Sequence, residues 1–201
     1  MPNLAPASKK QTRKSDAADV ILHYSVFPSE LGWMGCIWQG EALDGLTFGH
    51  RDREAAREAC LRLSENSSVP WMKLHPADEG APHVKLLVER LQRFAAGADD
   101  DFLDIDLNLK TSTPFQQRVT KLCRRIRSGQ SLSYGELAAK AGFPGAARAV
   151  GTVMSKNRFP LIVPCHRVLG SGGALGGYSA PEGLSMKRRL LQREGVEVRK
   201  S

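Results

Sequence analysis

The sequence predicts an α+β protein: a small antiparallel sheet with helices in its N-terminal part, and an all-helical C-terminal part containing a helix-turn-helix. Three observations support this. Short apolar runs separated by Pro28, Gly40 and the pair Asp44-Gly45 fill residues 20–48, which is typical of strands joined by turns. Apolar residues then recur at helical spacing, and a helix-capping pattern begins at residue 133. A chain of 201 residues is long enough for one domain or two small ones.

The N-terminal part starts with a basic leader. Residues 1–18 contain four Lys or Arg and few large apolar side chains, so we expect a flexible segment outside the fold. Two helices are predicted at residues 53–63 and 83–96, where small and apolar side chains recur every three or four positions. The strands that precede them are predicted at residues 20–27, 32–39 and 45–48.

An acidic connection separates the two parts. It runs from residue 99 to residue 108, and a short strand is expected at residues 102–107. We place the boundary near residue 110, which gives an N-terminal domain of residues 19–110 and a C-terminal domain of residues 111–201. The first helix after the boundary is predicted at residues 114–127, with a proline in its first turn.

Composition argues against several classes of protein. No apolar run approaches the roughly 20 residues that span a bilayer, and the polar N-terminus lacks a signal peptide's apolar stretch, so we expect neither a membrane protein nor a secreted one. The four cysteines lie far apart, which favours thiols in a reducing compartment. Cys36, Cys60, His23 and His50 form no convincing zinc ligand set, so we expect no metal and no cofactor.

Charge is distributed unevenly along the chain. Residues 1–110 hold 13 Lys and Arg against 17 Asp and Glu, whereas residues 111–201 hold 16 against 4. A basic C-terminal part indicates a polyanionic partner, of which nucleic acid is the commonest. The alternative is a basic surface that serves solubility alone.

The helix-turn-helix is predicted from local signals. Ser133 with Glu136 forms a capping-box pattern, and Gly142 with Pro144 ends the first helix. The second helix, at residues 146–156, is built mostly from small residues. Its one long side chain in the first turns is Arg148, which suits insertion into the minor groove or the space left by a displaced base. Small residues that merely pack against a neighbouring helix are the alternative.

Cys165 is the candidate nucleophile. A lone cysteine is usually a small buried hydrophobe, but this one follows the apolar run 159–163, adjoins His166 and Arg167, and precedes the glycine-rich stretch 170–179. The thiolate is the reactive form, and nearby cations or a base lower a thiol's pKa from about 8.5. His166 is the candidate base, and Glu194, one of the four acids after residue 110, is the candidate group that orients its ring.

These motifs resemble the methylated-DNA–protein-cysteine methyltransferases, also called O6-alkylguanine-DNA alkyltransferases. The resemblance covers residues 111–195, and the segments 32–33 and 45–49 resemble the family's sheet-bearing domain more loosely. It implies an RNase H-like N-terminal domain and a winged helix-turn-helix C-terminal domain. The segments that carry the resemblance are 115–119, 133–138, 146–151, 157, 164–168, 176–179 and 194–195.

The resemblance also implies roles for individual residues. Cys165 would accept the alkyl group, His166 would take the thiol proton through a water molecule, Glu194 would hold His166, and Asn157 would brace the network. The residues implied to contact DNA are Arg148, in place of the extruded base, Tyr134, Gln116, Ser171 and Arg167. The residues implied to form the substrate pocket are Tyr178, Ser179, Leu175 and Val168.

One departure from the family pattern lies beside this pocket. Residues 180–183 form a loop two residues longer than the common pattern, which either alters the alkyl groups that fit or only lengthens a surface turn. Thr120 stands where an aromatic residue often follows Val119, which we interpret as a packing change.

The resemblance implies repair of double-stranded DNA carrying O6-alkylguanine or O4-alkylthymine by a monomer, in the cytoplasm, or in the nucleus if the cell is eukaryotic. Three alternative functions compete with this one. A DNA-binding protein that recognises alkylated bases without transfer would lack the acceptor thiol. A transcription regulator would carry an extra regulatory domain, and a cysteine hydrolase would need an acyl pocket that nothing in the sequence suggests.

Overall fold

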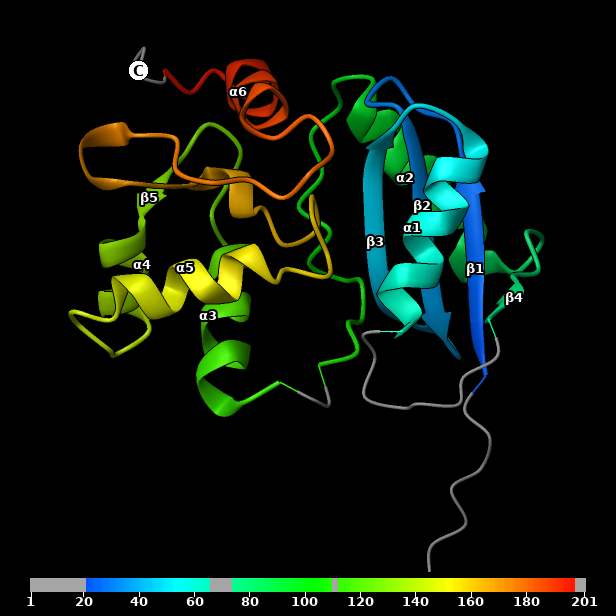
Figure 1. Ribbon diagram of the computed structural model, residues 1–201, viewed down its shortest axis with the longest axis horizontal. Helices are drawn as coiled ribbons and strands as arrows, with labels where there is room; N and C mark the ends of the chain where they lie inside the picture. The colour runs from blue at the N-terminus through cyan, green and yellow to red at the C-terminus, as the bar shows by residue number, and fades with distance from the viewer. Residues whose placement is uncertain (1–20, 66–73, 110–111, 198–201) are drawn as a thin grey trace, which may run out of the picture.

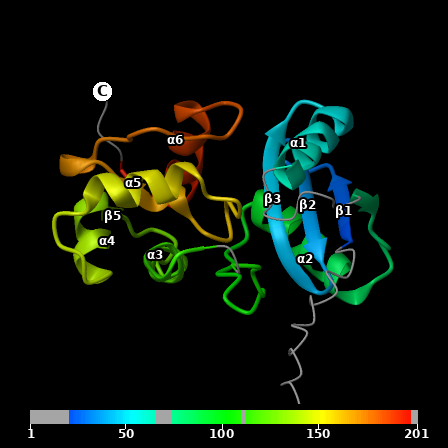
Figure 2. The same cartoon turned by 60° about the horizontal axis from the view of Figure 1, so that its bottom comes forward.

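The computed structural model describes residues 21–65, 74–109 and 112–197 (Figure 1). The predicted basic leader lies outside the described residues. Residues 21–109, here called the N-terminal half, and residues 112–197, the C-terminal half, lie side by side in both ribbon views (Figures 1 and 2). Within the described ranges, no helix combines the length and apolar character needed to cross a membrane.

The N-terminal half contains a four-stranded sheet in the order β3-β2-β1-β4. Its first three strands are antiparallel, as predicted, but β4 pairs parallel with β1. The prediction of a purely antiparallel sheet is therefore wrong. Because β4 follows α1 (Arg53–Glu65), the chain returns through a helical crossover, which is the connection that parallel strands require. The strands are β1 (Leu22–Phe27), β2 (Trp33–Gln39), β3 (Ala42–His50) and β4 (Leu74–Pro76).

Helices cover both faces of this sheet. α1 packs closely on β2, where a side chain at Gly35 would collide with the Cys60 sulfur. The other face is covered by α2 (Pro82–Ala95), and the rings of Trp38 and His83 meet edge to face with centroids 5.2 Å apart. Alternation of side chains along β2 explains this, because successive residues point to opposite faces.

The acidic connection is an ordered turn and not the predicted strand. Arg90 binds the carboxylates of Asp100 and Asp104, while the Asp100 carboxylate also accepts from the backbone N–H of Phe102. Carboxylates that bond nearby backbone groups compete with strand pairing. Within this connection, only Leu107 forms a β-bridge, which pairs it with Leu43 of β3.

The C-terminal half contains the predicted helix-turn-helix, formed by α4 (Tyr134–Lys140) and α5 (Ala147–Ser155). The capping box at Ser133 is confirmed, since Ser133 Oγ accepts from Glu136 N and Glu136 Oε2 accepts from Ser133 N. Both bonds are local, which is why the sequence reveals them. The preceding helix α3 (Pro114–Arg124) starts where predicted and ends three residues earlier.

This half is not all-helical. Strands β5 (Leu132–Ser133) and β6 (Val168–Leu169) form a short parallel pair that joins the start of α4 to the segment after Cys165. Two-residue strands have too little sequence to show an alternating pattern. The remaining elements are the 3₁₀ turns η1 (Cys165–Arg167) and η2 (Ser171–Gly173) and the helix α6 (Leu184–Arg193).

Candidate active site

The candidate nucleophile lies on a 3₁₀ turn. Cys165 begins η1 directly after Pro164, and its N–H donates to the carbonyl of Val163 at 2.7 Å. The apolar run before it is buried, as predicted, and Cys165 itself is 5% exposed. A 3₁₀ turn, unlike a regular strand, lets successive side chains serve one site.

Asn157 holds the sulfur. Its Nδ2 donates to Cys165 Sγ at 3.1 Å and to the carbonyl of Val163 at 2.8 Å, and its Oδ1 accepts from Phe159 N. Burial raises the pKa of the Cys165 thiol, and the bond from Asn157 and the charge of Lys187 oppose this rise without cancelling it. The prediction of a lowered thiol pKa is therefore wrong for the protein alone. The thiol form is therefore favoured near pH 7 in the protein alone.

His166, the candidate base, directly follows Cys165 on the turn. Its ring is fully buried, and Nε2 lies 2.9 Å from Glu194 Oε1. Burial lowers the pKa of His166 although Glu194 opposes the shift, so the ring is neutral near pH 7. Nδ1 has no hydrogen-bond partner among the described protein atoms. With Nε2 bonded to the carboxylate, Nδ1 is the acceptor position.

Glu194 is held by two residues. Burial alone would raise its pKa, but the bonds from His166 and Arg167 outweigh burial and lower the pKa to about 2. Arg167 Nη2 donates to Oε1 at 2.8 Å and Nε to Oε2 at 2.9 Å. The carboxylate is therefore ionised and fixed in orientation beside the imidazole.

Arg167 does not lie where a DNA contact could reach it. It is 4% exposed, and its third nitrogen donates to the carbonyl of Ile126 at 2.5 Å. The expectation that Arg167 contacts DNA is wrong, because its Nε, Nη1 and Nη2 bond inward to Glu194 and to a backbone carbonyl. Its place in a basic segment did not reveal this.

Lys187 is a site residue that sequence reasoning missed. Its Nζ is buried and donates to the carbonyls of Val168, at 2.8 Å, and Leu175. Burial lowers its pKa to about 8, although the neighbouring Cys165 opposes the shift. A signal was present in the sequence: Lys187 shares a helical face with the apolar Leu190 and with Glu194.

Two tyrosines flank the sulfur. Tyr134 begins α4, and burial and the nearby Cys165 raise its pKa. Gly176, at φ +63°, approaches its hydroxyl so closely that an added Cβ would lie 3.1 Å away, which ties the glycine-rich stretch to the helix-turn-helix. Tyr178 has a buried hydroxyl without a partner among the described atoms, and burial raises its pKa well above the usual value.

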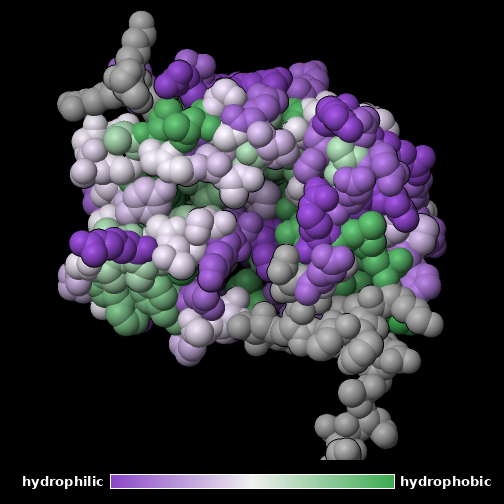
Figure 3. Space-filling model, viewed as in Figure 1, coloured by the Kyte–Doolittle hydropathy of each residue, from purple (hydrophilic) through white to green (hydrophobic). Residues whose placement is uncertain are grey.

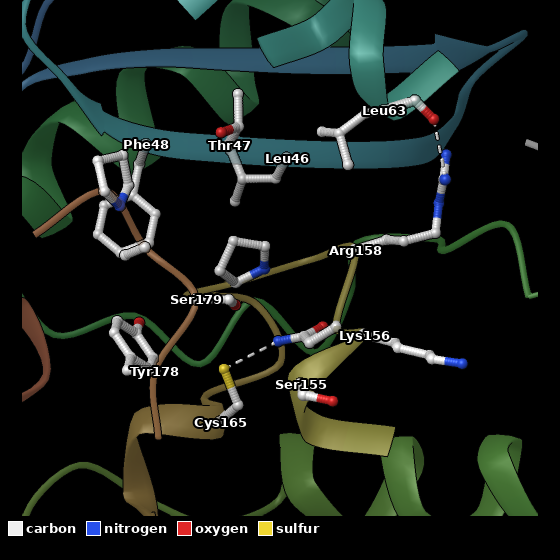
Figure 4. Close-up of a pocket in the computed structure, with 14 residues that line it drawn as sticks. Leu46, Thr47, Phe48, Leu63, Ser155, Lys156, Arg158, Cys165, Tyr178 and Ser179 are labelled. Atoms are coloured by element: carbon white, nitrogen blue, oxygen red, sulfur yellow. Dashed lines mark hydrogen bonds between the residues drawn. The ribbon is translucent and has the colours of Figure 1, made fainter. Parts of the chain in front are cut away.

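A cavity of about 610 Å³ opens at Cys165 between the two halves (Figure 4). Tyr178 and Ser179 line it together with Pro160. Figure 3 shows the surface hollowed where the halves meet, with hydrophilic side chains beside the hollow. The N-terminal half contributes Leu46, Thr47, Phe48 and Leu63, which no sequence pattern indicated.

Val168 and Leu175 do not line this cavity, and their place in a substrate pocket stays a prediction. Both are buried in the core, and it is their backbone carbonyls that serve the site by accepting from Lys187. The longer loop does reach the cavity: Ala180 and Pro181 line it. Pro181 also lies beside Gly49 of β3. The loop is therefore part of the cavity wall and not a remote surface turn.

The remaining candidate DNA contacts lie on the C-terminal half. Arg148 is exposed in the first turn of α5, and Ser171 is exposed in η2. Gln116 lies in the first turn of α3, where its Oε1 accepts from Thr113 N at 2.8 Å. Among the residues that the structure describes, no group of three or more His, Cys, Asp or Glu is arranged to hold a metal.

Comparison with known proteins points to one family. The family model "6-O-methylguanine DNA methyltransferase, DNA binding domain" matches residues 114–196. The methylated-DNA–protein-cysteine methyltransferase of Mycobacterium tuberculosis is 36% identical over 174 residues, which cover 87% of this chain and 93% of the relative. The constitutive enzyme of that name from Bacillus subtilis is 36% identical over 148 residues, 73% of this chain and 88% of the relative.

Solved structures give the same result. The M. tuberculosis OGT in complex with DNA superposes with a TM-score of 0.67 at 35% identity, covering 86% of this chain and 93% of that one. The O6-methylguanine-DNA methyltransferase of Pyrococcus kodakaraensis superposes with a TM-score of 0.61 at 27% identity, covering 87% and 99%.

The fold and the site define a class of protein that joins a helix-turn-helix to a buried cysteine, which is followed by a histidine bonded to a carboxylate. The relatives that this chain matches over most of their length all belong to one family within this class. The chain belongs to the methylated-DNA–protein-cysteine methyltransferase family.

Proposed function

We propose that this protein repairs DNA by direct reversal, transferring the methyl or other alkyl group from O6 of an alkylated guanine to Cys165, once per molecule. The observation that carries the proposal is the setting of the thiol. Cys165 lines a cavity between the halves, and its Sγ accepts a bond from Asn157. The next residue, His166, has a buried ring that is bonded to Glu194. This is the arrangement of nucleophile, base and orienting group that activates a weak nucleophile.

The reaction balances without a cofactor. The bond between sulfur and the alkyl carbon forms as the bond between that carbon and O6 breaks, and the electron pair of the broken bond stays on guanine. The thiol proton passes through a bridging water to His166 Nδ1, and from the protein to the departing base. The products are guanine and a thioether, and no neighbouring group can hydrolyse a thioether, so each molecule reacts once.

Base flipping brings the lesion to the thiol. An alkyl group on O6 is buried in the duplex, and extruding the base costs a few kcal/mol, less for a poorly paired lesion. Arg148 fills the space left in the stack, and Tyr134 supports the rotated nucleotide. Gln116 and Ser171 contact the DNA backbone. Tyr178 and Ser179 line the base pocket, with Ser179 able to donate toward O6.

The proposal extends to substrate and architecture. O4-alkylthymine in double-stranded DNA is a second substrate, and the protein acts as a monomer in the cytoplasm, or in the nucleus of a eukaryotic cell. We also propose that residues 19–110 form an RNase H-like domain and residues 111–201 a winged helix-turn-helix domain. The mixed sheet with helices on both faces and the β5–β6 pair support these assignments.

Intact-mass measurement tests the function. After incubation with a duplex carrying O6-methylguanine, the protein should gain about 14 Da, the mass of one CH₂, as expected for a covalent product, and peptide mapping should place the gain on Cys165. The variant Cys165→Ala should bind the duplex and gain no mass. Binding by the parent protein with no mass gain would instead identify a protein that recognises alkylated DNA without transfer.

A further inference from the structure

We propose that the ion pair of Asp44 and Arg158 positions Asn157 against the Cys165 thiol, so that the N-terminal half takes part in the reaction. The inference rests on the proposed function and assigns Asp44 and Arg158 as positioning residues. Figure 4 shows the part of this path that lies at the cavity, where Arg158 bonds to Leu63 of the N-terminal half and a dashed line marks the bond to the Cys165 sulfur.

The Arg158 side chain is bound entirely by the N-terminal half. Nη2 donates to Asp44 Oδ2 at 2.7 Å, and Nε donates to the Asp44 carbonyl at 3.1 Å. Nη1 donates to the carbonyl of Leu63, near the end of α1, at 3.0 Å. A guanidinium fixed at three nitrogens has a single orientation, since its donors form a rigid planar fork.

Asp44 is itself held in place. Its side chain is 8% exposed, and its second oxygen accepts from Asn108 Nδ2 at 2.7 Å. The backbone adds a further link, because Leu46 N donates to the carbonyl of Arg158 at 2.8 Å. Both the side chain and the main chain of Arg158 are therefore tied to β3.

Arg158 directly follows Asn157, whose side chain bonds the reactive sulfur at 3.1 Å. Fixing Arg158 fixes the turn that carries Asn157, and the bond from Asn157 is the largest effect opposing the rise in the Cys165 pKa that burial causes. A small displacement of this turn would lengthen that bond. Misplacement by about 1 Å can slow an enzymatic step by about 100-fold.

The two halves are also joined by hydrogen bonds other than those of the Asp44–Arg158 pair. Arg189 of α6 donates to the carbonyl of Glu30 at 2.9 Å, and Arg193 donates to that of Ala95 at 2.5 Å. Neither contact adjoins Asn157. The Asp44–Arg158 pair is therefore the described link that couples the position of β3 to the thiol.

The test compares two isosteric substitutions, Asp44→Asn and Asp100→Asn. The carboxylates of Asp44 and Asp100 each bind an arginine and each accept one further N–H bond. Both side chains are largely buried, with 8% of Asp44 and 19% of Asp100 exposed. Asp100 pairs with Arg90 inside the N-terminal half, so its variant controls for the loss of a partly buried ion pair. Arg158→Lys is the second test variant, because lysine keeps the charge but not the fork.

Three quantities are measured on the full-length protein. The first is the pH midpoint for labelling of Cys165 by iodoacetamide, followed on the Cys165 peptide by mass. The second is the single-turnover rate of methyl transfer from a saturating duplex carrying O6-methylguanine. The third is the melting temperature, which separates loss of stability from loss of positioning.

In Asp44→Asn the labelling midpoint should rise by roughly half a pH unit or more, because a donor to the thiolate is displaced. Transfer should slow by about tenfold. Arg158→Lys should shift both quantities in the same direction. Asp100→Asn should keep the parent midpoint and a rate within about twofold, even if its melting temperature falls.

Parent-like midpoints and rates in Asp44→Asn and Arg158→Lys would overturn the proposal and leave the pair with a purely structural role. Equal shifts in Asp100→Asn would also overturn it. Failure of the proposed function looks different: the parent protein would take no methyl group. The labelling midpoint would then still decide whether the pair positions the thiol.

Discussion

Arg167 binds both carboxylate oxygens of Glu194, at 2.8 and 2.9 Å, while one of those oxygens also lies 2.9 Å from His166 Nε2. The arginine beside the nucleophile thus points into the protein. Two parallel hydrogen bonds between a planar guanidinium and a carboxylate fix the orientation of the carboxylate. The bond to His166 is fixed as a result, which keeps Nδ1 in the acceptor role.

The Glu194 carboxylate should make stability depend on acid pH. Its pKa is about 2 in the folded protein against an ordinary value of 4.5. A lowered folded pKa gives stability that is complete above about pH 5 and is lost as pH falls toward 2, at most about 3 kcal/mol. Urea unfolding at several pH values should show this loss in the parent and not in Glu194→Gln.

The control for that experiment is Glu182→Gln, which changes an exposed glutamate. It should keep the acid dependence of the parent. Glu194→Gln should also be less stable than the parent at pH 7, because it leaves the buried Arg167 without its charge partner. An unchanged acid dependence in Glu194→Gln would show that this carboxylate is not the group responsible.

Lys187 should help to ionise Cys165. Its positive charge favours the thiolate, and burial places its own pKa at about 8. In Lys187→Met we expect the pH midpoint of iodoacetamide labelling at Cys165 to rise and labelling at pH 7.5 to slow several-fold. Arg188→Met removes an exposed charge from the adjacent position and should leave the midpoint unchanged. A parent-like midpoint in Lys187→Met would exclude this electrostatic role.

Arg148 should matter for duplex DNA and not for a base that is already free. Arg148→Ala should slow transfer from a duplex carrying O6-methylguanine by about tenfold or more, because extruding the base costs a few kcal/mol. Reaction with free O6-benzylguanine should be unchanged. Arg127→Ala, which removes an exposed cation outside the helix-turn-helix, should affect only salt-dependent binding. Equal losses on both substrates would contradict base replacement by Arg148.

Ser133 should support both the helix and Tyr134. Its hydroxyl accepts from Glu136 N at 3.1 Å, and Tyr134 is the next residue. Ser133→Ala should lower the free energy of unfolding by about 0.5–2 kcal/mol, measured by urea denaturation. Ser131→Ala, at an exposed position two residues earlier, should change it by less than about 0.5 kcal/mol. Equal losses of unfolding free energy in Ser133→Ala and Ser131→Ala would mean that the capping hydrogen bond does not stabilise the protein.

The structural features that the sequence predicts correctly are those encoded by residues close together in the chain. The capping box at Ser133 and the proline that starts α3 depend on residues three or four apart, and the structure confirms both. The adjacency of Cys165 and His166 likewise needs no knowledge of the fold. The parallel β4 was not predicted, because its pairing with β1 joins segments about 50 residues apart.

The family, the candidate nucleophile with its neighbouring candidate base, and the helices of the helix-turn-helix could be predicted from the chain alone, since short-range bonds and contiguous motifs encode them. The contacts of Arg167 with Glu194, of Lys187 with the region of Cys165, and of Asp44 with Arg158 became visible only in the folded protein. Asp44 and Arg158 are separated by 114 residues. Contacts over such separations depend on how helices and sheet pack, and no periodicity or charge pattern in the chain records that packing.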